Sequence, residues 1–149
     1  MDETFPRPCS IAAALTFLGE KWSLLVIREL ALGVHRFDQI ARNTGAPRDI
    51  LTSRLRHLEA AGVIEKRQYQ ERPQRFGYHL TAAGGELRPI LLSIAQWGDR
   101  WAVDEPVTAF VHTCGEEVEL VHTCRACGGE VTGLDLRARR LTPASAASG

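Results

Sequence analysis

One stretch of the sequence, residues 47–80, restricts the fold more than any other part of the chain. Leucines recur in its first part at intervals of four and three residues, which predicts an amphipathic helix with one stripe facing a core. These leucines are Leu51, Leu55 and Leu58. Pro47 suits the start of this helix because its missing N–H group is not needed there. Gly62 suits the position just after the end of the helix.

A hairpin is predicted directly after this helix. Residues 63–69 and 76–80 have the composition of strands, and the loop 70–75 between them is polar and contains a proline. Arginines lie on the outer face of the predicted helix and in the loop. A helix that can enter the major groove of DNA, followed by a basic hairpin that can reach the neighbouring backbone, is typical of a winged helix.

Further helices are predicted on both sides of these elements. We therefore expect residues 9–101 to form a mainly α domain with a small β-hairpin (α+β), a winged helix-turn-helix domain with dimerising terminal helices. Side chains that can accept a hydrogen bond from a backbone N–H group mark the starts of three helices. These predicted N-caps are Ser10, Asp38 and Thr81. The helix that starts at Thr81 is expected to run unbroken to Trp101.

Positive charge is concentrated in one part of a chain whose net charge is zero. Residues 36–80 contain nine Lys and Arg against five Asp and Glu, a net charge of +4. Residues 104–130 contain six acids against Arg125 alone, a net charge of −5. Phosphate should therefore be attracted to the first segment and repelled by the second.

Six short motifs follow one another along residues 9–101. They are Cys9-Ser10-Ile11, Gly19-Glu20-Lys21-Trp22, Arg36-Phe37, Leu51-Thr52-Ser53-Arg54-Leu55, Leu58-Glu59-Ala60-Ala61-Gly62 and Tyr78-His79-Leu80-Thr81-Ala82-Ala83-Gly84. In this order they resemble the HxlR-type transcriptional regulators. The resemblance implies a homodimeric, MarR-like winged-helix repressor or activator, whose first and last helices form the dimer. As a dimer it would bind a pseudo-palindromic operator.

The candidate DNA contacts lie on the outer face of the predicted helix and on the hairpin. Helix side chains would meet base edges and phosphates, and hairpin arginines would reach the backbone or the minor groove. These residues are Arg48, Asp49, Thr52, Ser53, Arg54, Arg56, Arg72 and Arg75. Double-stranded DNA is thus the predicted partner. Ala46 stands where the family often has a capping serine, and the missing cap could cost about 1 kcal/mol.

The last predicted helix carries more apolar side chains than one small domain needs. An exposed stripe of this size usually marks an interface, although the helix could also simply cover its own core. With the first helix, the predicted dimer contacts are Leu15, Ile90, Ile94, Trp97 and Trp101. A small-molecule effector could bind near the tryptophans, between the core and the dimer helices.

Cys9 precedes the first predicted helix. A thiol near a helix N-terminus can have a lowered pKa, because unpaired N–H groups favour the thiolate. The resemblance to HxlR-type regulators makes Cys9 a candidate sensor of quinones, aldehydes or oxidants. An inert or buried cysteine is the alternative.

The segment 107–136 is predicted to form a small ribbon that bears cysteine and histidine. Cys124-x-x-Cys127-Gly has the spacing of a zinc knuckle, and Cys114 with His112 or His122 would complete a four-ligand structural site. A hairpin without metal and a Cys124–Cys127 redox pair are the alternatives. Structural zinc is the one candidate cofactor, and residues 142–149 are expected to be disordered.

Few features of the sequence favour other functions. It shows no nucleophile–base pair, phosphate loop or carboxylate pair, so we expect no enzymatic activity. The alternative to a regulator is a winged-helix protein-interaction module with the ribbon as its docking surface. No apolar run approaches the roughly 20 residues that span a bilayer. We therefore expect no membrane partner and a cytoplasmic, nucleoid-associated location in a bacterium.

Overall fold

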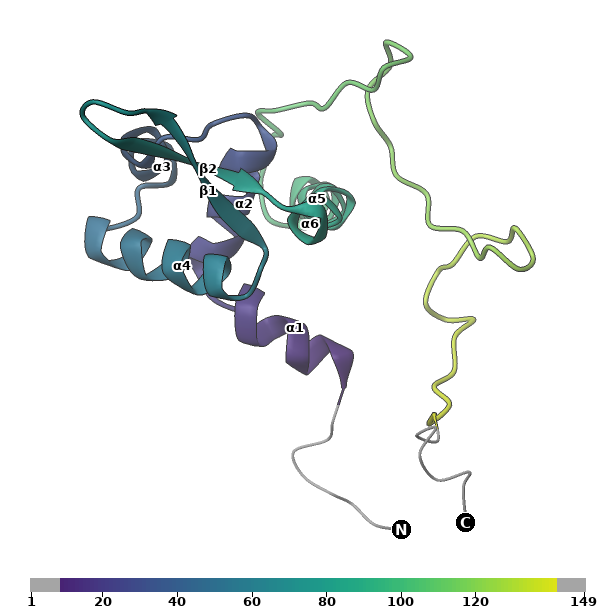
Figure 1. Ribbon diagram of the computed structural model, residues 1–149. Helices are drawn as coiled ribbons and strands as arrows, with labels where there is room; N and C mark the ends of the chain where they lie inside the picture. Colours follow the sequence, from purple (N-terminus) through teal and green to yellow (C-terminus); the bar gives the residue numbers. More distant parts are fainter. Residues whose placement is uncertain (1–8, 142–149) are drawn as a thin grey trace, which may run out of the picture. The chain divides into compact units, whose positions relative to one another are not determined.

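The computed structural model describes residues 9–141 (Figure 1). The chain divides into two compact units between Glu105 and Pro106. All regular elements belong to the first unit. They are α1 (Ser10–Leu18), α2 (Lys21–Ala31), α3 (Phe37–Thr44), α4 (Arg48–Ala60), β1 (Ile64–Gln70), β2 (Arg75–Leu80), α5 (Ala82–Gly85) and α6 (Arg88–Trp101).

The core of the first unit forms around α2, which contacts α1, α3, α4, α6 and β2 (Figure 1). The leucine stripe of α4 faces this core as predicted, because all three of its leucines are buried. They pack with apolar residues of α2, α3 and the start of β1. These partners are Val26, Ile27, Leu30, Ile40, Val63 and Ile64. The winged helix-turn-helix arrangement expected from the sequence is confirmed.

The hairpin is antiparallel, with Ile64 opposite Leu80 and a bulge between Gln68 and Gln70. Its base is attached to the segment between α2 and α3, because the N–H of Tyr78 donates to the carbonyl of His35 at 2.9 Å. At the loop end, β1 runs one residue further than the predicted strand 63–69, and β2 begins one residue before the predicted strand 76–80. The hairpin therefore extends from the core at a fixed base.

Buried Glu29 joins α2 to α3. Its carboxylate accepts hydrogen bonds from the Asn43 amide at 2.7 Å and from the Arg28 guanidinium at 2.7 and 3.0 Å. Its backbone carbonyl also accepts from the N–H of Val34 at 3.0 Å. A charge that is only 4% exposed needs such partners, since an unpaired one would strongly destabilise the fold.

Two of the predicted helix caps are wrong. Ser10 is the first residue of α1, and the N-cap is Cys9, whose Sγ accepts from the N–H of Ala12 at 3.2 Å. Asp38 lies within the first turn of α3, and Arg36 occupies the N-cap position without a side-chain hydrogen bond. An acidic side chain in the first turn still interacts favourably with the helix dipole.

The predicted long final helix is broken in two. Thr81 caps a helix as expected, since its hydroxyl accepts from the N–H of Gly84 at 3.2 Å, but this helix is the short α5. An unbroken helix would need the N–H of residue 89 to bond the carbonyl of Gly85. Pro89 has no N–H, and it lies in the first turn of a new helix, α6.

The second unit contains no regular strand among its described residues. The predicted ribbon is reduced to two isolated bridges, which pair Val111 with Glu117 and Thr123 with Glu130. Each bridge closes a tight turn that contains a glycine with positive φ, Gly115 at +96° and Gly128 at +72°. The segment thus forms two successive small hairpins, and the predicted disorder of residues 142–149 lies outside the described residues.

Within residues 9–141, no single helix is long and apolar enough to cross a membrane. The pair α1 and α2 would be long and apolar enough together, but it is bent by 78°.

Gly84 allows α5 to approach the start of the hairpin. A Cβ at this position would overlap the backbone carbonyl of Val63, which cannot easily move. We expect Gly84→Ala to lower the free energy of unfolding by about 1–3 kcal/mol, as overpacking does. Urea denaturation would measure it. The matched control is Gly85→Ala, whose Cβ meets only the mobile end of Arg88 at 3.0 Å. Equal midpoints for both variants would contradict this packing.

Candidate nucleic-acid interface

The turn between α3 and α4 gives the recognition helix its direction. Gly45 has a φ of +73°, a left-handed conformation that favours glycine. Pro47 is the N-cap of α4 and not its first residue, and it provides no side-chain hydrogen bond. The missing cap expected beside Ala46 is thus observed. Ala46 itself is buried, and its N–H donates to the hydroxyl of Thr44 at 3.2 Å.

The outer face of α4 is available for contact. Asp49, Ser53 and Arg56 are exposed on the side opposite the buried leucines. Thr52 is half-buried and donates its hydroxyl hydrogen bond to the carbonyl of Arg48 at 2.8 Å. Asp49, Ser53 and Arg56 are thus open to a partner, whereas the hydroxyl hydrogen of Thr52 is already bonded within the helix.

Two predicted DNA-contacting arginines have partners within the protein. Arg48 pairs with Asp38 at 2.8 Å, and its guanidinium lies 4.8 Å from the centre of the Phe37 ring. Arg54 lies 3.6 Å from the Glu20 carboxylate, and its side chain is only 23% exposed. Arg48 therefore joins the first turns of α3 and α4, while Arg54 joins α4 to the start of α2.

The other predicted arginines are exposed. Arg56 on α4, Arg72 in the loop and Arg75 at the start of β2 have no ion pair within the part of the chain that the structure describes. Arg36 and Arg42 are also exposed and without an ion pair in the described residues, but neither is among the DNA contacts predicted from the sequence. Only tertiary structure distinguishes them from paired arginines, since partners such as Glu20 lie far away along the chain.

Two stacked histidines support the base of the hairpin. The rings of His35 and His79 are 4.0 Å apart between centroids, and His35 Nδ1 lies 2.8 Å from the carbonyl oxygen of Tyr78. Burial lowers the pKa of His79, and the nearby charges of His35 and Arg67 lower it further, against a smaller opposite effect of Glu65. Both effects disfavour a positive charge on His79 beside the His35 ring.

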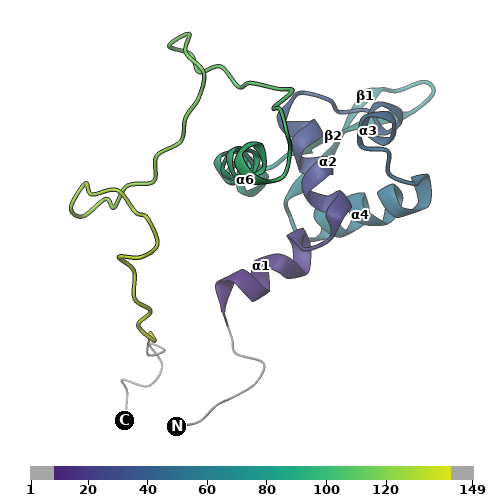
Figure 2. The same ribbon diagram turned by 180° about the vertical axis from the view of Figure 1, so that it is seen from behind.

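The predicted dimer contacts are all exposed. Neither α1 nor α6 contains a buried residue. Large apolar side chains on both helices face solvent in the single chain, and Trp97 and Trp101 are 62% and 73% exposed. From behind, α1 is seen at the end of α4, away from the hairpin (Figure 2). There, His57 Nε2 lies 2.9 Å from the carbonyl of Thr16.

Cys9 is exposed at the start of α1. Its thiol accepts a backbone N–H, so the sulfur takes part in capping the helix. An exposed cysteine thiol at a helix N-terminus is accessible to reagents.

The cysteines of the second unit are divided between its two hairpins. Cys114 lies in the first turn, and Cys124 and Cys127 lie in the second. Hydrogen bonds from the backbone N–H groups of Cys127 and Ala126 lower the pKa of the Cys124 thiol. The predicted site of His112, Cys114, Cys124 and Cys127 is not assembled, because within residues 9–141 no three metal-binding side chains are gathered. The spacing of the cysteines indicated each turn, but it could not indicate whether the two hairpins lie close enough to share a metal ion.

Comparison with known proteins agrees with this architecture. The family model of HxlR-like helix-turn-helix proteins matches residues 17–106. An uncharacterised HTH-type transcriptional regulator of Mycobacterium tuberculosis is 41% identical over 137 residues, which cover 90% of this chain and 84% of the relative.

Two solved structures extend the comparison. PA1607, a candidate transcription factor, has a TM-score of 0.81 and 30% identity over 91% of this chain and 96% of its own. The redox regulator HypR in its oxidised form has a TM-score of 0.56 and 30% identity over 62% of this chain and 96% of its own. The chain belongs to the HxlR-like helix-turn-helix family and is a transcriptional regulator.

Proposed function

We propose that this regulator acts as a homodimeric repressor that binds a pseudo-palindromic operator in bacterial DNA and has no catalytic role. The observation that carries the proposal is exposed Arg56 on the outer face of α4, followed along the chain by a hairpin with Arg72 and Arg75. None of the three has an ion pair among residues 9–141. Guanidinium groups without internal partners are free to bind phosphate or guanine.

The candidate contacts have distinct roles in this proposal. Ser53, Arg56 and Asp49 on the outer face of α4 meet base edges and nearby phosphates. Thr52 lies beside them, and Arg72 and Arg75 contact the backbone or the minor groove. Arg48 and Arg54 hold α4 in place through their ion pairs in the free protein. Arg48 joins the DNA contacts through the N–H groups that do not bind Asp38, and Arg54 joins them only where a phosphate replaces Glu20.

Replacing Arg56 tests the DNA-binding proposal. We expect Arg56→Ala to weaken binding to the DNA upstream of the protein's own gene by about 1–3 kcal/mol, as loss of a base-reading arginine does. Fluorescence anisotropy at several salt concentrations would measure it. The control is Arg67→Ala, which removes the same charge from a residue that pairs with Glu65. A wild type without salt-dependent binding would contradict the proposal and favour a protein-interaction module.

The homodimer is proposed from the exposed apolar side chains of α1 and α6. Ile90, Ile94, Trp97 and Trp101 recur at helical spacing, so they form one stripe along α6. Leu15 on α1 is 56% exposed as well. Large exposed apolar surfaces of this kind are typical of interfaces.

A charge placed in the stripe tests the dimer. We expect native mass spectrometry of the wild type to give twice the chain mass of 16.5 kDa, and Ile94→Glu to give the monomer. A buried unpaired carboxylate strongly destabilises an interface. Arg88→Glu introduces the same group on the far side of α6 and should leave the dimer intact. A wild type that stays monomeric at high concentration would refute the assignment.

We further propose that Cys9 is the sensor of a thiol-reactive or oxidising signal. The exposed thiol supports this role, and HypR, a redox regulator with 30% identity, supports it by similarity. If the Cys9 thiols of two protomers join, they lose two protons and two electrons to the oxidant as one disulfide forms.

Mild oxidation tests the sensor. After treatment with diamide, we expect peptide mass mapping without reductant to find Cys9 in a disulfide or adduct, and DNA binding to weaken. Cys9→Ser should keep its DNA binding under the same treatment. Mapping separates Cys9 from the three cysteines of the second unit. Unmodified Cys9 with unchanged DNA binding would rule out the switch.

We also propose a structural zinc ion in the second unit. Cys124 and Cys127 fit two ligands of a knuckle, since backbone N–H groups already point at the Cys124 sulfur. Cys114 and His112 would supply the other two if the hairpins closed on one another. For protein purified without chelator, we expect the native mass spectra that test the dimer to show one zinc ion per chain. Spectra without zinc would contradict the site.

A further inference from the structure

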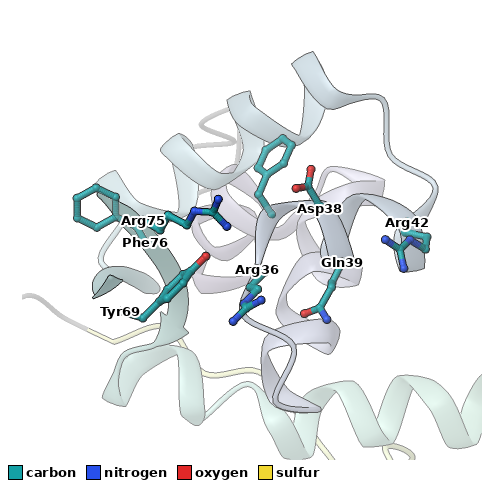
Figure 3. Close-up of a pocket in the computed structure, with 8 residues that line it drawn as sticks. Arg36, Asp38, Gln39, Arg42, Tyr69, Arg75 and Phe76 are labelled. Atoms are coloured by element: carbon teal, nitrogen blue, oxygen red, sulfur yellow. The ribbon is translucent and has the colours of Figure 1, made fainter. Parts of the chain in front are cut away.

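A hollow of about 510 Å³ lies between α3 and the hairpin (Figure 3). It is lined on one side by residues at the start and along the outer face of α3, and on the other by residues of the strands. The residues that matter here are Arg36, Gln39, Arg42, Tyr69, Arg75 and Phe76. Of these six residues, Arg75 alone is among the DNA contacts predicted from the sequence.

The hollow is positively charged. Arg36, Arg42 and Arg75 have no ion pair among residues 9–141. Among the described residues, Asp38 is the one carboxylate that lines the hollow, and it is already bound to Arg48 at 2.8 Å. Three guanidinium groups therefore face a space whose negative charge is neutralised. This arrangement attracts an anion.

The side chains of the hollow are partly held in position. The guanidinium of Arg36 lies 4.9 Å from the centre of the Tyr69 ring, so the aromatic face restrains it (Figure 3). Tyr69 and Phe76 are 46% and 42% exposed, and they offer apolar surface at the same opening. The start of α3 adds the positive end of a helix dipole.

We propose that this hollow binds the phosphodiester backbone of DNA, with Arg36, Arg42 and Arg75 on phosphate oxygens and Tyr69 and Phe76 against the sugars. The inference rests on the proposed DNA-binding function. Guanidinium forks match phosphate geometry in bidentate hydrogen bonds. Contacts of this kind fix the register of a protein on the duplex but read no sequence.

A phosphate in the hollow would also set the position of the recognition helix. Arg48 ties the start of α4 to Phe37 and Asp38 in the first turn of α3. The hollow and the outer face of α4 thus belong to one connected unit. Arg36 and Arg42 are positioning residues for DNA recognition.

The salt dependence of DNA binding tests this site. We expect Arg36→Ala and Arg42→Ala each to reduce the slope of log affinity against log salt by about 1. Affinity should fall by the same factor for the DNA upstream of the protein's own gene and for a random duplex, because phosphate carries no sequence information. Arg36→Lys should keep the slope. Arg100→Ala, which removes one charge from α6, should change nothing.

The outcomes separate this site from the wider proposal. If the wild type binds DNA and Arg56→Ala weakens it, but Arg36→Ala/Arg42→Ala keeps the full slope, the hollow site is overturned and the DNA-binding function stands. Unequal losses on the two duplexes would also overturn it. A free anion is the other source of the same chemistry. NMR signals of Arg36 that saturate with inorganic phosphate but do not respond to DNA would assign the hollow to that anion instead.

Discussion

The buried carboxylate of Glu29 is the interaction on which the DNA-reading elements depend. It holds α3 against α2 through Asn43, while the carbonyl of the same residue holds the N–H of Val34. Glu29 therefore holds the connection between the two helices at Val34 and the C-terminal part of α3 at Asn43. The position of α3 then determines where the Gly45 turn directs α4. Losing one partner would leave a buried charge unpaired, which is strongly destabilising.

The helices outside this core are held much more weakly. Since α1 and α6 bury no residue in the single chain, their stability should depend on a partner surface. In the single chain, α1 is attached to α4 near its C-terminal end, where His57 meets the carbonyl of Thr16 and lies 6.0 Å from the Phe17 ring. The helix that Cys9 caps thus ends in contact with the recognition helix.

Local patterns predicted the elements well where one physical rule dominated. The leucine period gave α4, and the change to strand composition with a polar loop gave the hairpin. Cys9 was missed as a cap because a thiol is an uncommon acceptor, and the break before α6 was missed because the apolar period continues past Pro89. The pairing of Arg54 with Glu20 and the separation of the tail hairpins depend on distant contacts that no local pattern contains.

Pairing divides the nine cations of residues 36–80 into two groups. Arg48, Arg54, Lys66 and Arg67 have carboxylate partners, and the other five have none among the described residues. The pairs are not equally fixed. Arg48 and Asp38 are 69% and 73% exposed, so their bond is worth about 0–1 kcal/mol, and the N–H groups of Arg48 that do not bind Asp38 stay open to a DNA phosphate. Arg54 is 23% exposed, and it would have to leave a partly buried position to reach DNA. Arg48 can therefore contact DNA while it still binds Asp38, whereas Arg54 would have to break its pair with Glu20.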